Sequence, residues 1–343
     1  MALISASSLI ITSSITNDKT SSKTKIVTSF YPIYIIATNI VEGIDEIEVV
    51  NLTEYEKGCL HDYQLTTRDM KRLENADIII MNGGGMEAFV EDIFDAYPNV
   101  PVIDSSTGIP LLSGTGHSHD EDLHVHEDDH AHDDHAHDDH THDDHAHDDH
   151  AHDDHAHDDH VHDDHSHEYN AHVWMNTEYY IMQIENITEE LSKLDPSNSK
   201  VFKDNSKRYI EEIRDLQSDI RTRLSQYKDI PIIIFHDAFA YLADEIGLNV
   251  VHIISMDENT HLSAGEIKEI IDKINKYNVK VLLTEEQYSV SIAETISSET
   301  ASKTYIVDSI VTGPSDNDAY IKGMKKNLDI LEEAYKEVLA KTN

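Results

Sequence analysis

Short apolar runs alternate with helical patterns of apolar spacing in two blocks of the chain. In the first block, buried strands are predicted at residues 26–30, 44–53, 77–81 and 100–106. Helices are predicted between them, at residues 32–41, 67–75 and 86–97. Strands and helices that alternate at such short spacing favour a parallel sheet with helices on both faces. Loops at the carboxyl ends of such strands are where ligands usually bind.

The second block repeats this alternation. Strands are predicted at residues 231–235, 249–255, 279–287 and 303–310. Helices are predicted at residues 240–247, 263–278, 291–301 and 320–340. One of these helices begins with Ser263 and carries Glu266 three residues later, which is the pattern of a capping box.

A single long helix is predicted between the two blocks. From Pro196 to Tyr227, apolar residues recur at intervals of three, four or eight: Val201, Tyr209, Ile213, Leu216, Ile220 and Leu224. These positions share one face of a helix of about thirty residues, which is roughly 45 Å long. That length suits a strut between two lobes better than a helix inside one lobe.

The predicted fold class is therefore α/β, with two lobes that each contain a mostly parallel sheet flanked by helices. One long rigid helix joins the lobes. We expect the first lobe at residues 25–195, the linker helix at residues 196–228 and the second lobe at residues 229–343.

Residues 1–24 precede the first lobe and have a different composition. Residues 3–15 are apolar with many Ser and Thr, and no Lys or Arg comes before Lys19. This stretch is too short to span a bilayer. It is typical of the remnant of an export signal followed by a polar tether, although a basic start and a lipid-anchoring cysteine are missing. A plain polar tail is the alternative interpretation.

Residues 117–168 follow neither a helical nor a strand pattern. This tract repeats Ala-His-Asp-Asp-His and holds twenty of the 25 His, twenty-one Asp or Glu, and no Lys or Arg. It has too few apolar side chains for a packed core, so we expect a disordered loop. Imidazole and carboxylate groups bind divalent transition metals, so the loop is predicted to collect metal weakly. The weak sites begin with His117, His119, His124, His126, His130, His132, His135, His137, His140 and His142.

Charge and cysteine content exclude several kinds of partner and site. The tract contributes −21 to a formal net charge of −41, so the remainder carries −20. Nucleic acid is not expected as a partner, because phosphate binding needs clustered Lys and Arg. Cys59 is the single cysteine, so the chain has no internal disulfide and no zinc site built on several thiolates.

Five His lie outside the tract: His61, His172, His236, His252 and His261. A lone His in a folded domain is usually structural, and we interpret His252 and His261 in that way. The other three follow predicted strands or lie in loops at strand ends. Asp308 ends the last predicted strand, so each lobe supplies two ligand candidates at the mouth of its sheet.

Five stretches of the chain, in order, resemble the zinc- and manganese-binding solute receptors of ABC importers. They are GCLHDYQLTTRDMKRLENADIIIMNGGGMEAFVE, NAHVWMNT, PIIIFHDAFAYLADEIGL, LLTEEQYSVSIAETI and IVDSI. Together with a His-rich loop in the family's place, they are most similar to the zinc-uptake branch, the zinc-specific cluster A-I substrate-binding proteins. The resemblance implies two lobes joined by one rigid helix, with a metal held between them.

The same resemblance implies that His61, His172, His236 and Asp308 occupy the family's ligand positions. The chain departs from the family where Asn170-Ala171, Glu286 and Ser309 replace residues of motifs that often contain proline. Glu285 is a weaker ligand candidate, for which a helix-capping or interlobe hydrogen bond is expected. Water would fill the fourth position if Asp308 lay too far away.

Three imidazoles and one carboxylate suit four-coordinate Zn²⁺. Manganese-selective relatives carry a carboxylate where His236 stands, so zinc is favoured, although Mn²⁺, Ni²⁺, Co²⁺ or Cu²⁺ can substitute. The resemblance implies a monomeric, exported, extracytoplasmic receptor, either tethered to a membrane or free. It would deliver zinc to the membrane permease of an ABC importer.

Other functions remain as alternatives: a zinc store or buffer, a manganese receptor, or a zinc hydrolase. No enzyme activity is expected, because the chain has no HExxH motif and four protein ligands would leave no open metal position.

Overall fold

The computed structural model describes residues 23–342, except 54–57, 59, 61, 62, 88, 115–168, 255–261 and 287–289. His61, His261 and all ten of the tract His predicted as weak sites therefore lie outside the described residues. In the part that is described, no helix combines the length and the apolar character needed to cross a bilayer.

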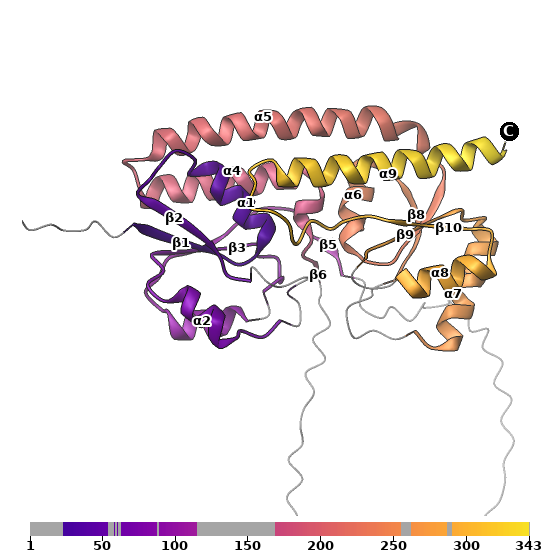
Figure 1. Ribbon diagram of the computed structural model, residues 1–343, viewed down its shortest axis with the longest axis horizontal. Helices are drawn as coiled ribbons and strands as arrows, with labels where there is room; N and C mark the ends of the chain where they lie inside the picture. The colour runs from indigo at the N-terminus through magenta and orange to yellow at the C-terminus, as the bar shows by residue number, and fades with distance from the viewer. Residues whose placement is uncertain are drawn as a thin grey trace, which may run out of the picture.

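The first lobe is built on a four-stranded parallel sheet in the order β2-β1-β3-β4. Its strands are β1 (Thr24–Thr28), β2 (Ile47–Asn51), β3 (Ile78–Met81) and β4 (Val102–Asp104). Its helices are α1 (Tyr31–Ile40), α2 (Thr67–Leu73) and α3 (Val90–Ala96). Each predicted strand and helix of this block is present, and most are a few residues shorter than expected. In Figure 1, α1 and α2 lie on opposite sides of the sheet.

The second lobe repeats this design with the strand order β10-β9-β7-β8, again parallel throughout. Its strands are β7 (Pro231–Ile234), β8 (Asn249–Ile253), β9 (Val281–Thr284) and β10 (Lys303–Ile306). Its helices are α6 (Ala238–Ile246), α7 (Ala264–Tyr277) and α8 (Val290–Glu299). The predicted capping box at the start of α7 is confirmed, because the Ser263 N–H donates to the Glu266 carboxylate at 2.7 Å.

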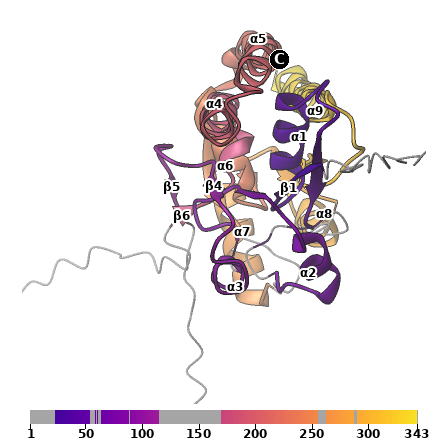
Figure 2. The same ribbon diagram turned by 90° about the vertical axis from the view of Figure 1, so that its left-hand side faces the viewer.

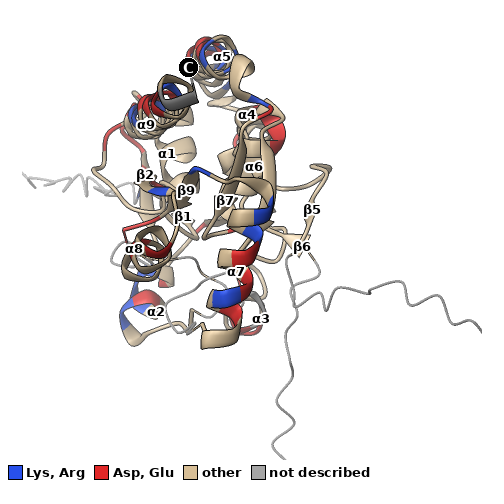
Figure 3. Ribbon diagram, turned by 90° about the vertical axis from the view of Figure 1, so that its right-hand side faces the viewer, with Lys and Arg blue, Asp and Glu red and all other residues tan. Residues whose placement is uncertain are grey.

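Helix α7 shows why the spacing of apolar residues identified the helices. Its Ile270 and Ile274, four residues apart, are buried against the sheet. Lys268 pairs with Asp272 at 2.6 Å and Lys273 pairs with Glu269 at 2.9 Å on its exposed side. Figure 3 shows these acidic and basic residues mixed along the helix.

Strand β7 connects two layers of core. Ile232 and Ile234 belong to the main core, which continues through both lobes. Ile233 and Phe235 point the other way, into a smaller cluster formed with α7 and α8. This alternation follows from the two-residue repeat of side chains along a strand. A strand apolar on both faces is therefore covered by helices on both faces, as the sequence predicted.

The linker is α5 (Ser199–Leu224), followed by one 3-10 turn, η2 (Ser225–Tyr227). It starts three residues later than predicted, and one assigned position was wrong: Val201 is 38% exposed. Phe202 is buried in its place. At about 100° per residue, Phe202 lies two turns before Tyr209 on the same face, whereas Val201 is rotated away from that face.

A second helix, α9 (Ala319–Thr342), runs beside α5. The sequence predicted this helix but not its pairing with α5. Figure 1 shows the two helices side by side across both lobes. Tyr227 stacks on Tyr335 with ring centroids 5.0 Å apart, and Arg223 pairs with Glu332 at 2.6 Å. Two helices rather than one therefore brace the lobes.

Direct contacts also fix the lobes to each other. The Tyr31 hydroxyl donates to the Pro314 carbonyl at 2.8 Å, and the Trp174 indole N–H donates to the Ser309 carbonyl at 2.7 Å. The Thr177 N–H, at the start of α4 (Thr177–Leu194), donates to the Glu245 carboxylate at 2.8 Å. A shared core and buried interlobe hydrogen bonds favour a rigid pair of lobes.

A small antiparallel pair flanks the His-rich tract. Strand β5 (Leu112–Ser113) pairs with β6 (Tyr169–Asn170), and the chain between them contains the whole tract. Figure 2 shows this pair at one side of the first lobe. The tract is thus an insertion between two paired strands; His172 lies two residues after β6 and immediately before the 3-10 helix η1 (Val173–Met175).

Candidate metal centre

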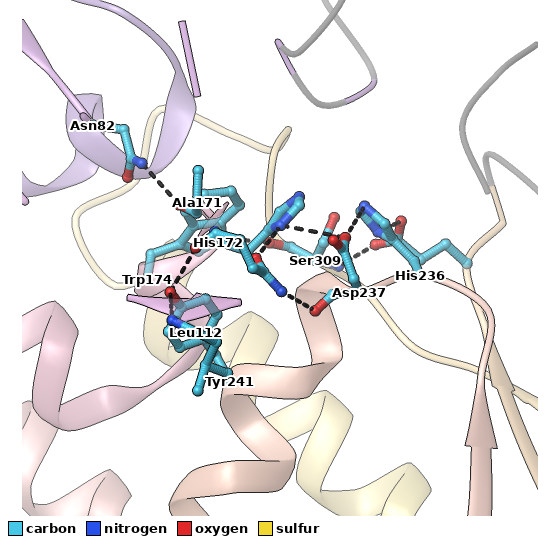
Figure 4. A network of polar contacts seen from close by, with 11 residues as sticks. Asn82, Leu112, Ala171, His172, Trp174, His236, Asp237, Tyr241 and Ser309 are labelled. Atoms are coloured by element: carbon cyan, nitrogen blue, oxygen red, sulfur yellow. Dashed lines mark hydrogen bonds and ion pairs between the residues drawn. The ribbon is translucent and has the colours of Figure 1, made fainter. Parts of the chain in front are cut away.

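Two predicted ligands, His172 and His236, come together between the lobes. His172 follows β6 in the first lobe, and His236 follows β7 in the second. Their ring centroids are 4.7 Å apart, with the rings nearly perpendicular. With Asp237 they form a group whose possible ligand atoms all lie within 4.8 Å of one another. In Figure 4, the Asp237 carboxylate lies between the two imidazole rings.

The orientation of His172 is set by Asn170. The amide oxygen of Asn170 lies 2.8 Å from His172 Nδ1 and also accepts the His172 backbone N–H at 3.0 Å. The Asn170 amide nitrogen donates to the Asp237 carbonyl at 2.8 Å, which fixes which side of the amide carries oxygen. This network assigns the ring proton of His172 to Nδ1 and therefore the lone pair to Nε2.

His236 is oriented by Glu285, which follows β9. The Glu285 carboxylate lies 2.8 Å from His236 Nδ1 and accepts the Ser309 N–H at 2.7 Å through its other oxygen. Glu285 is 1% exposed, so both of its oxygens are used inside the protein. The ring proton of His236 is again assigned to Nδ1, which leaves the Nε2 lone pair for a metal. The described hydrogen bonds of Glu285 stay within the second lobe, so the interlobe bond expected for it is not among them.

Asp237 is a candidate ligand that the sequence analysis missed. Its carboxylate lies 3.5 Å from His172 Nδ1 and 3.7 Å from His236 Nε2. Asp237 occupies the N-cap position of α6 but makes no side-chain capping bond there. The helical backbone at Asp237 turns it to the same side as His236, although neighbours on a strand would point apart. The available signal was an acidic residue directly after a strand-end His.

The two imidazoles of this group are shielded from water, whereas the Asp237 side chain is 18% exposed. His172 is fully buried, and the ring of Trp174 lies 5.2 Å from it. Trp174 in turn packs edge-on against Phe30. Burial strengthens the attraction between a cation and the surrounding nitrogen and oxygen donors.

A family model described as zinc-uptake complex component A, periplasmic, matches residues 26–334. The chain belongs to this family. The match covers most of the chain and confirms the family resemblance of its five motifs.

Members of this family and related structures show how far the likeness extends. The chain is 28% identical to the high-affinity zinc uptake system protein ZnuA of Bacillus subtilis, over 92% of this chain and 89% of that protein. It is 27% identical to the zinc-binding protein AdcA of Streptococcus pyogenes, over 92% of this chain but only 58% of AdcA. The fold is similar to that of the Pseudomonas aeruginosa protein FpvC in complex with Ni²⁺, with a TM-score of 0.69, 26% identity, and coverage of 92% and 98%.

Asp308, the fourth position suggested by the family resemblance, directly precedes Ser309, whose N–H donates to Glu285. The Asp308 carboxylate accepts the Ile310 N–H at 2.7 Å. Burial raises the pKa of Asp308 above its usual range, the Ile310 hydrogen bond lowers it, and the nearby Glu285 carboxylate raises it again. Asp308 is not a member of the three-residue group found among the described residues. Its role as a ligand therefore stays a prediction.

His61 lies outside the described residues, so its role also stays a prediction. The described neighbour Tyr63 packs on Phe89, with ring centroids 5.8 Å apart. The Tyr63 hydroxyl donates to Asp69 at 2.7 Å. His252, expected to be structural, lies on β8 with its Nδ1 3.3 Å from Lys273 Nζ.

Proposed function

We propose that this chain is an extracytoplasmic zinc receptor, which captures Zn²⁺ between its lobes and delivers it to the membrane permease of an ABC importer. One observation supports this most directly. His172 and His236 come from different lobes, and each has its Nδ1 held so that Nε2 carries the lone pair. Relatives named for zinc binding and zinc uptake support zinc as the cargo.

The proposed ligands are the Nε2 atoms of His172 and His236, with His61 and Asp308 completing the set by family resemblance. Asp237 is the alternative carboxylate ligand, because its carboxylate lies 3.7 Å from His236 Nε2 and belongs to the same three-residue group. Three nitrogen donors and one carboxylate favour Zn²⁺ over Mn²⁺. Other divalent metals would still bind, and FpvC was solved with Ni²⁺ and with Mn²⁺.

Metal capture in this proposal requires little movement of the lobes. Helices α5 and α9 brace both lobes, and Trp174 and Tyr31 bond across the interface. Loops at the strand ends would order around the metal, and the permease would reopen them. The proposed lobe boundaries are residues 25–195, 196–228 and 229–343, in an exported monomer. The tract at residues 117–168 is proposed as a weak collector.

The test is a competitive zinc titration of the full chain with single His variants. We expect His172→Ala and His236→Ala to abolish the tight site, because each removes a ligand nitrogen. His252→Ala is the matched control, since it removes a partly buried imidazole from β8 and should leave the tight site unchanged. Tight binding that survives both site substitutions would reject the proposed centre.

A zinc store is the second candidate function, because the tract alone holds twenty His. A variant lacking residues 117–168 separates the two. A receptor keeps one tight site after this deletion, whereas a store loses nearly all of its capacity. We propose a binding protein rather than an enzyme, in keeping with relatives named for zinc binding and zinc uptake.

A further inference from the structure

A buried carboxylate lies in the glycine-rich loop after β3, outside the metal centre. Glu87 is 3% exposed and follows Gly83, Gly84 and Gly85, which all have positive φ angles. Its carboxylate accepts the Asn82 N–H at 2.7 Å and the Gly83 N–H at 3.1 Å. The loop thus turns its own N–H groups toward an internal carboxyl group, as backbone nests do toward bound anions.

Asn82 connects this loop to the metal centre. Its amide nitrogen donates to the Ala171 carbonyl at 2.9 Å, a contact drawn in Figure 4. Its amide oxygen accepts a hydrogen bond from Gln183 at 2.9 Å, which fixes the orientation of the amide. Asn82 is fully buried, so no water competes for these bonds.

The Ala171 carbonyl belongs to the peptide that enters His172. The N–H of the same peptide is the His172 N–H, and it donates to Asn170 at 3.0 Å. Asn82 therefore binds the carbonyl edge of this peptide plane, and Asn170 binds the opposite, N–H edge. A shift of Asn82 would tilt the plane and move the His172 ring with it.

The loop has little room to move without disturbing this peptide. A Cβ at Gly83 would lie 1.8 Å from the Asp104 carboxylate, and one at Gly84 would lie 3.7 Å from the Ala171 Cα. The backbone passes Asp104 this closely only because Gly83 lacks a side chain, whereas a Cβ at Gly84 would make an ordinary contact with Ala171. Loss of the carboxyl group that gathers the loop would be transmitted to Ala171 through the side chain of Asn82.

We infer that Glu87 is a positioning residue of the metal centre: through Asn82 it fixes the Ala171–His172 peptide and thereby the place of the His172 imidazole. This inference rests on the proposed function. Residues that orient a metal ligand typically change metal affinity by about 10–100-fold when they are replaced. We expect Glu87→Gln to lower zinc affinity within that range, because Glu87 offers a separate oxygen to each N–H group and Gln replaces one of these oxygens with an NH₂ donor.

The experiment measures zinc affinity by competition and the visible absorption of the Co²⁺-loaded full chain. Glu87→Gln and Asn82→Ala break the connection at different points, so one serves if the other fails to fold. Leu191→Ala, which removes a buried side chain near the end of α4, controls for a general loss of stability. Asp77→Asn controls for loss of a carboxylate at the opposite end of β3.

The inference predicts weaker zinc binding and an altered Co²⁺ absorption for Glu87→Gln and Asn82→Ala, with both controls unchanged. In a His172→Ala background, Glu87→Gln should have no further effect. If Glu87→Gln binds like the parent protein while His172→Ala does not, the positioning role is rejected and the proposed function stands. If His172→Ala has no effect, the proposed function itself fails. If Glu87→Gln and Leu191→Ala lose zinc affinity equally, the loss reflects lower stability alone, and the positioning role is rejected.

Discussion

The two histidines of the metal centre are held at equal distance by groups of different charge. His236 Nδ1 lies 2.8 Å from the carboxylate of Glu285, and His172 Nδ1 lies 2.8 Å from the neutral amide oxygen of Asn170. Hydrogen bonds with an ionised partner are roughly twice as strong as neutral ones. The second lobe therefore supports its histidine by direct charge, and the first lobe by a network of amides and peptides.

A carboxylate is present on the first-lobe side too, but it is remote. Glu87 acts through Asn82 and the Ala171 carbonyl rather than on the ring. The Glu87 carboxyl group is buried among backbone N–H groups and not beside the proposed metal position. The comparison shows that similar ring orientations can be produced by a direct ion contact or by an indirect backbone support.

The largest expected effect concerns Glu87 and the pH dependence of stability in the metal-free protein. Burial raises its pKa from 4.5 to about 7; bonds from Ser29, Asn82 and Gly83 lower it, and Asp104 raises it. The folded state thus holds this proton more tightly than the unfolded state does. Its contribution to stability is fully present below pH 4.5 and is lost as the pH rises through about 7.

Urea unfolding from pH 4 to pH 8 tests this. Relative to Glu87→Gln, the unfolding free energy of the parent protein should fall by on the order of 3 kcal/mol as the pH rises. Asp77→Asn provides the reference for an exposed carboxylate. Parallel pH curves for the parent and Glu87→Gln proteins would show that Glu87 ionises normally.

The next effect is the difference between the two direct supports. We expect Glu285→Gln to weaken zinc binding by about 100-fold and Asn170→Ala by about 10-fold, at the two ends of the usual range. The charged support should cost more to remove, because it both orients His236 and strengthens Nε2 as a donor. Competitive zinc titration at one pH measures both variants. Equal losses would remove the distinction between charged and neutral support.

The smallest effect concerns the bond that ties the two supports together. The Trp174 indole N–H donates to the carbonyl of Ser309, whose own N–H donates to Glu285. Trp174→Phe keeps most of the ring packing and removes this donor. We expect a loss of about 1 kcal/mol in the free energy of unfolding, with little change in zinc affinity. A large loss of affinity would mean that Trp174 acts on the metal centre itself.

The sequence predicted the fold well where local periodicity decides the structure. Both parallel sheets, the capping box of α7 and the long α5 follow from spacings of two and three to four residues. The pairing of α9 with α5 was not predicted, because the amphipathic pattern of a helix does not identify the element that packs against its apolar face. Val201 was assigned to the core in place of Phe202 because it lies eight residues before Tyr209, although seven residues, the spacing of Phe202, come closer to two full turns.

The candidate site was predicted in part. His236 was found because it follows a predicted strand, whose carboxyl end is a usual place for ligands. His172 was found from its place just after the tract, within a motif of the family resemblance, because the short strand β6 before it was not predicted. Asp237 was missed because alternation along a strand places neighbours on opposite sides, and the turn into α6 overrides that rule. The support from Asn82 and Glu87 was missed because residues 82 and 171 meet only in the folded chain.

The most direct test of the metal centre is a long-range proton–nitrogen NMR correlation of the histidine rings during zinc titration. A variant lacking residues 117–168 retains five His, so each ring can be resolved. With one equivalent of Zn²⁺, Nε2 of His172 and of His236 should both shift to metal-bound values while Nδ1 stays protonated. Binding through Nδ1, or a tight zinc site that leaves both rings unchanged, would contradict the proposed centre.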